Sequence, residues 1–137
     1  MPDFGPARPH PTAGAVLAAA RPPLVAFNVD LVTSDLAVAK QIAAGLRESG
    51  GGMPGVRALG LYLHDRNRAQ VSTNVHDHRA VPLREIVEYV RQHAEVAEAE
   101  LIGLAPRAAF DGFPDDVPLR GFDPERHLLE DVLRGVR

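Results

Sequence analysis

The stretch that decides the fold is VRALGLYLHDRNRAQVSTNVH, residues 56–76. Its first part, 56–63, places Leu59, Leu61 and Leu63 on one side of an alternating pattern, which predicts a strand with one buried face. A polar run then predicts a turn, and residues 69–76 alternate almost strictly between apolar and polar side chains. The stretch therefore predicts a β-hairpin with strands at 56–63 and 69–76.

Similar patterns continue outward from the hairpin on both sides. On the N-terminal side, LVAFNVDL (24–31) alternates as a strand, and Ser34 is expected to cap a helix over 35–49. On the C-terminal side, helical spacing predicts a helix over 82–97, followed by a strand over 98–104. The order βαββαβ predicts an α+β ferredoxin-like sandwich, in which a four-stranded antiparallel sheet carries both helices on one face.

The rest of the chain is divided into an arm and a C-terminal helix. Residues 1–23 are rich in Pro and Gly and predict an extended arm, so that residues 24–137 form the single folded domain. Asp123 and Pro124 predict the start of a last helix, with Leu128, Leu129, Val132, Leu133 and Val136 facing inward. The predicted core consists of Val25, Phe27, Val29, Ile42, Leu46, Leu59, Leu61, Val71, Val75, Ile86, Val90 and Leu101.

Composition excludes several functional classes. With no cysteine among 137 residues, disulfides, thiolate nucleophiles and Cys-ligated metals are excluded. The net charge of −3 and the scattered arginines do not predict a nucleic-acid partner. No apolar run approaches the roughly 20 residues that span a bilayer, and the N-terminus has no signal-peptide pattern. We therefore expect a cytoplasmic protein without a membrane partner.

The face of the sheet opposite the helices is the most informative feature. In the predicted topology the first and third strands are central neighbours, so Asn28 and Asp30 should lie close to Ser72 and Asn74. Adjacent amide, carboxylate and hydroxyl groups offer directional hydrogen bonds that suit a ligand with amide and carboxylate groups. The alternative is a face that is merely solvated or covered by another domain.

Two other motifs carry less information. His76 and His78 form a His-x-His pair that would project to one side of a strand, but two ligands make a weak metal site. We take them as surface histidines and expect no metal. The glycines 50–52 are followed by Met-Pro rather than Gly-Lys, which predicts a helix stop and not a phosphate-binding loop.

Six segments, in this order, carry a family resemblance: PDFGP (2–6), HPTAGAVLAAARPPLVAFNVDL (10–31), AKQIAAGLRESGGG (39–52), VRALGLYL (56–63), AQVSTNV (69–75) and ELIGLAPRAAF (100–110). Together they resemble the glutamate formiminotransferase family, specifically the C-terminal subdomain of its transferase domain. No single segment is specific, but the collinear set is.

The resemblance implies a folate-dependent transferase. The family binds tetrahydrofolate, its co-substrate, between two α/β subdomains and moves a formimino group to it from N-formiminoglutamate. By matching position, the resemblance implies folate contacts from the arm residues Gly5, Pro6, Ala7, Arg8, Pro9, His10, Pro11, Thr12, Ala13 and Gly14. A Gly- and Pro-rich arm lets backbone amides approach a flat ring closely. The alternative for the arm is a disordered tail. To these contacts we add Asn28, Asp30, Ser72 and Asn74 on the sheet.

The catalytic histidine of the family has no match here. It lies in the N-terminal subdomain, so none of the six histidines inherits its role, and we expect no catalytic residue in this chain. One hypothesis is a folate-binding half that needs an N-terminal-type subdomain or subunit as its partner. The alternatives are a stand-alone pterin-binding or regulatory module and a truncated piece of a longer enzyme. An exposed sheet face also makes a homodimer an option.

Overall fold

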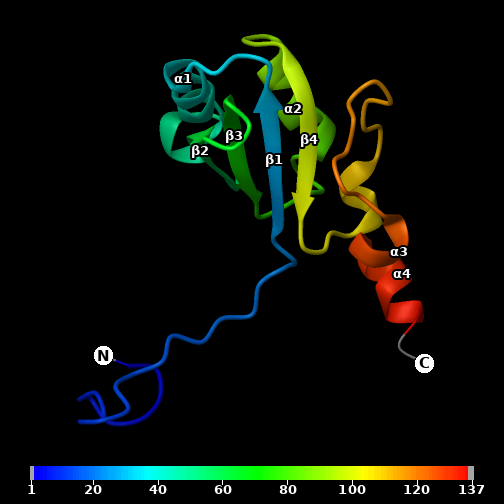
Figure 1. Cartoon of the computed structure of the whole chain (residues 1–137). Coiled ribbons are helices and arrows are strands. Elements are labelled where there is room, and N and C mark those ends of the chain that lie inside the picture. The colour runs from blue at the N-terminus through cyan, green and yellow to red at the C-terminus, as the bar shows by residue number, and fades with distance from the viewer. Residues whose placement is uncertain (1, 136–137) are drawn as a thin grey trace.

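A four-stranded antiparallel sheet forms the centre of the molecule. The computed structural model describes residues 2–135. The strands are β1 (Val25–Leu31), β2 (Val56–Leu63), β3 (Arg68–Val75) and β4 (Val96–Ile102), and their order in the sheet is β2-β3-β1-β4 (Figure 1). The predicted α+β fold is confirmed, including the central position of β1 and β3.

Two helices, α1 (Leu36–Leu46) and α2 (Leu83–Arg91), connect the strands. The cap of α1 is Asp35, whose carboxylate accepts a hydrogen bond from the Ala37 amide at 2.8 Å, so the prediction of Ser34 was wrong by one residue. A short 3₁₀ turn, η1 (Glu48–Gly50), follows α1.

The second helix is shorter than the pattern predicts, because pairing with β1 draws the following residues into the sheet. Leu31 pairs with Val96, so β4 begins at Val96 and α2 ends at Arg91 rather than at residue 97. Tertiary pairing here overrides the helical spacing of the alanines.

The core lies between the sheet and the two helices, and ten of the twelve predicted core residues are buried. The exceptions are Leu59 and Leu61, which are 62% and 41% exposed and point to the face without helices. The core side of β2 carries Val56, Ala58 and Gly60 instead. A Cβ at Gly60 would lie 2.3 Å from the Lys40 amide nitrogen of α1. Helix α1 therefore packs so close to β2 that small residues are required there.

The C-terminal helix is divided in two, α3 (Pro124–His127) and α4 (Leu129–Arg134). Asp123 caps α3 as predicted, by accepting from the Glu125 amide at 3.0 Å. The break occurs at Leu128, where the backbone is extended and the neighbouring residues bond to Ala105. Leu128 is buried, whereas Leu133 is 67% exposed, contrary to prediction. Val136 lies outside the described residues.

The two edges of the sheet differ. After the 3₁₀ turn η2 (Arg107–Phe110), the chain returns along β4, where Ala99 donates to the Pro118 carbonyl and accepts from the Arg120 amide, both at 2.8 Å. Strand β2 has no such neighbour on its outer side within residues 2–135. The outer side of β2 is therefore the free edge of the sheet.

The N-terminal arm extends away from the domain (Figure 1), and its residues 2–24 are exposed. Residues 10–14 form a turn in this arm, closed by two backbone hydrogen bonds of 2.9 Å between His10 and Gly14. The imidazole Nδ1 of His10 accepts from the Thr12 and Ala13 amides at 3.3 and 3.1 Å. This turn is therefore held by its own residues rather than by contact with the sheet.

Candidate ligand-binding face of the sheet

The open face, which is the side of the sheet without helices, gathers the four polar residues predicted on β1 and β3. Asn28 lies opposite Ser72 in the β1–β3 register, and Asn74 is on the same side of β3, opposite Ala26. Asn28 and Ser72 are half-buried, and Asn74 is exposed. Amide and hydroxyl groups with both donors and acceptors thus line the middle of this face.

Asp30 also lies on this side, but it is only 1% exposed. One of its carboxylate oxygens accepts from Gln70 Nε2 at 2.6 Å, and the other accepts from an Arg66 guanidinium nitrogen at 3.1 Å. Burying a charge in this way requires such partners. Both carboxylate oxygens of Asp30 therefore accept hydrogen bonds from the protein, and the side chain lies below the surface of the open face.

The ion pairs continue across β4. Arg66 also donates to Glu98 at 3.1 Å, and Arg120 bonds to Glu100 at 2.5 Å. Glu100 in turn accepts from Asn28 Nδ2 at 3.5 Å. With Arg68, which lies 3.9 Å from Glu98, three guanidinium groups face the three carboxylates of this charge network on the β1–β4 side of the open face. The sequence missed it, because Arg66 and Arg120 come from a turn and a loop whose positions no periodicity indicates.

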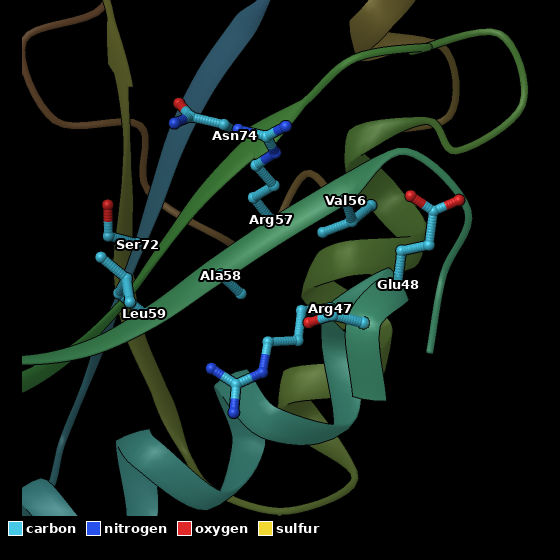
Figure 2. Close-up of a pocket in the computed structure, with 9 residues that line it drawn as sticks. Arg47, Glu48, Val56, Arg57, Ala58, Leu59, Ser72 and Asn74 are labelled. Carbon is cyan, nitrogen blue, oxygen red and sulfur yellow. The ribbon is translucent and has the colours of Figure 1, made fainter. Parts of the chain in front are cut away.

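The β2–β3 side of the open face leads into a groove of about 520 Å³ that follows the free edge (Figure 2). Its lining consists of Arg47, Glu48, Ser49, Val56, Arg57, Ala58, Leu59, Ser72 and Asn74. Two of the predicted sheet residues, Ser72 and Asn74, line the groove, whereas Asn28 and Asp30 do not. Arg57 was missed because the alternation of β2 was assigned to the wrong face. With Leu59 outward, Arg57 is outward too.

The ten predicted arm residues lie apart from this groove. Several of them enclose a separate hollow of about 540 Å³, whose lining belongs entirely to residues 2–16. The structure thus contains two separate groups of predicted folate contacts, one on the arm and one on the sheet.

The histidines do not form a metal site. No group of three or more His, Asp or Glu residues within 2–135 is arranged to hold a metal ion. His76 follows the end of β3 at Val75 and so is not on the strand, and His78 is buried at 8% exposure, which corrects its assignment to the surface. Nor does any helix in this range have the length and apolar character that crossing a membrane requires.

Comparison with known proteins identifies the family. The model of the formiminotransferase domain matches residues 26–111, which include all of the sheet except Val25, the first residue of β1. The chain belongs to the formiminotransferase family. Asn28, Asp30, Ser72 and Asn74 all lie inside the matched span, whereas the arm lies before it.

The curated relatives of this formiminotransferase-family chain are longer proteins. A glutamate formimidoyltransferase of Streptococcus pyogenes is 39% identical over 98% of the chain, and one of Thermoplasma acidophilum is 38% identical over 94%. The chain covers 47% and 44% of those two proteins. A formimidoyltransferase-cyclodeaminase of Rattus norvegicus is 39% identical over 80% of the chain, which covers 22% of it. The chain thus spans less than half of the length of these relatives.

Proposed function

We propose that this chain forms the folate-binding half of a glutamate formimidoyltransferase, which transfers a formimino group from N-formiminoglutamate to tetrahydrofolate. The observation that carries the proposal is the open face, where Asn28, Ser72 and Asn74 stand together on a sheet side that no helix covers. Membership of the formiminotransferase family and the names of the relatives support the same activity.

The chain's own residues have binding and orienting roles in this proposal. The sheet presents a flat surface to a flat heterocycle, and the side-chain amides and hydroxyl pair with its ring N–H and C=O groups. The bond from Asn28 Nδ2 to Glu100 turns the Asn28 oxygen toward the ligand as an acceptor. The arm from Gly5 to Gly14 folds over the ligand and becomes ordered when it binds.

Proton transfer is assigned to a residue outside this chain. None of the six histidines lines the groove along β2, and none takes part in the charge network of the open face. We therefore assign the general acid or base to an N-terminal-type subdomain or subunit that faces the open side of the sheet. The cytoplasm is the proposed location, and tetrahydrofolate is the proposed co-substrate.

The test compares the purified chain alone with the chain plus an N-terminal-type half supplied in trans. We expect no useful conversion of formiminoglutamate and tetrahydrofolate by the chain alone, and turnover in the mixture. Asn74→Ala should raise the KM for tetrahydrofolate more than it changes the unfolding midpoint, because Asn74 is exposed. Deleting residues 5–14 should likewise raise the KM for tetrahydrofolate more than it changes the unfolding midpoint.

Two outcomes would contradict the proposal. Turnover by the chain alone would return the search for a base to His10, His64 and His76. Folate binding without turnover in the mixture would favour a stand-alone pterin-binding module, as would binding that the added half does not strengthen.

A further inference from the structure

Two arginines of the groove differ from those of the charge network in having no acidic partner. Arg66 and Arg120 are each held by carboxylates, whereas no carboxylate of residues 2–135 lies within ion-pair distance of Arg47 or Arg57. Glu48 also lines the groove, but Figure 2 shows its carboxylate turned away from both guanidinium groups. The groove therefore contains positive charge that no carboxylate of residues 2–135 neutralises.

Arg57 is the better placed of the two to hold an anion. It lies directly opposite Asn74 in the β2–β3 register, and Figure 2 shows both side chains at the same end of this strand pair. A guanidinium fork and a neighbouring amide N–H match the two oxygens of a carboxylate. Arg47 instead follows the C-terminus of α1, where the helix dipole offsets part of its charge. We therefore expect Arg47 to attract an anion more weakly.

Apolar surface separates the two arginines. Leu59, which is 62% exposed, supplies most of this surface, because Val56 and Ala58 also line the groove but are buried. A large aliphatic side chain left in water beside an unpaired arginine favours a ligand with an apolar body and a charged end. A compact, highly charged anion such as phosphate would leave that apolar surface unused.

We propose that this groove binds the carboxylate-bearing end of an elongated ligand, with the carboxylate on Arg57 and Asn74 and the apolar body over Leu59. The identity of the ligand rests on the proposed function: if the chain binds folate, the aryl-glutamate end of folate is the part that fits this groove. The heterocycle would then lie toward Ser72 and Asn28 at mid-sheet.

The probe for this proposal is 4-aminobenzoyl-L-glutamate, which has the aryl and carboxylate groups but neither a pterin nor a transferable group. Titration of the full chain, followed by amide chemical shifts, should perturb the resonances of β2 and β3 around Arg57. Arg57→Gln should weaken binding about tenfold, the usual effect of removing one charge-assisted hydrogen bond. Arg57→Lys should bind the probe with an affinity between those of the wild type and Arg57→Gln, because lysine keeps the charge but not the two parallel N–H donors of the guanidinium group. Arg47→Gln should have a smaller effect.

Arg126→Gln is the matched control, because Arg126 is also exposed but lies on α3, outside the groove. It should bind the probe as the wild type does. Equal affinity of Arg57→Gln and Arg126→Gln would overturn the inference. So would an absence of shift changes along β2 at millimolar probe.

The inference and the proposed function can fail separately. If the probe binds through Arg57 but tetrahydrofolate is never a substrate, even with the N-terminal-type half added, the groove assignment stands and the function falls. If turnover occurs in the mixture while Arg57→Gln leaves both the KM for tetrahydrofolate and the probe affinity unchanged, the groove assignment alone is wrong.

Discussion

Replacing Gly60 by alanine tests how closely helix α1 packs on the sheet. The new Cβ would lie 2.3 Å from the Lys40 nitrogen and 2.5 Å from the Ala39 carbonyl carbon, so the helix must withdraw by about 1 Å to restore ordinary contact. Overpacking of this kind costs about 1–3 kcal/mol, and backbone atoms cannot rotate out of the way as side chains do. The lower chain entropy of alanine returns about 0.5–1 kcal/mol. We expect a net loss of about 1 kcal/mol.

The assay is urea denaturation followed by circular dichroism, with a melting curve beside it. For a chain of this size the expected loss lowers the melting temperature by about 3–4 °C. Gly135→Ala is the control, because a Cβ there would lie 3.5 Å from the Val132 carbonyl oxygen, an ordinary contact. A Gly60→Ala variant as stable as the wild type would refute the close packing of α1. It would also remove the explanation for the outward position of the leucines on β2.

Three further substitutions separate the faces of the sheet. Phe27→Ala should lose about 3–5 kcal/mol in the same denaturation assay, because its ring is fully buried; a loss below about 1 kcal/mol would contradict its place in the core. Leu59→Ser should change stability by less than about 0.5 kcal/mol, since the side chain is 62% exposed, and a large loss would place it in the core after all. Asp30→Ala should cost about 2 kcal/mol, because Gln70 loses its buried partner while Arg66 keeps Glu98. The double variant Asp30→Ala/Gln70→Ala should lose less than the sum of the two single losses, and strict additivity would show that the two side chains do not interact.

The sheet could be predicted from the sequence because its central strands alternate without ambiguity. On β1 and β3 the apolar and polar sides differ in kind, so Phe27 and Val71 could only face inward. On β2 both sides are apolar, and the larger leucines suggested the wrong side. What decided the matter was the space available beneath α1, which only Ala58 and Gly60 fit. The distance between α1 and β2 is set by packing in the folded structure, and the alternation of residues along β2 does not indicate it.

The candidate site could be predicted only where it depends on the strands. The neighbouring positions of Asn28 and Ser72 follow from the strand order and the register. The burial of Asp30 does not follow from the strand order, because its partner Arg66 comes from a turn that lies far along the chain. The groove was missed for a related reason, since Arg47 and Arg57 line the same groove only when the end of α1 is placed beside β2. Long-range proximity of this kind is fixed by packing, not by local spacing.

The difference between the two sheet edges limits how copies of this chain can assemble. Within residues 2–135, the Pro118–Arg120 segment bonds to Ala99 on the outer side of β4, whereas the outer side of β2 pairs with no strand. Two copies that join β2 to β2 use up the one available edge of each. A pair joined in this way would be closed by a two-fold axis. The short segment beside β4 interrupts the opposite edge at Ala99, the middle residue of that strand, and would hinder the addition of a further strand there.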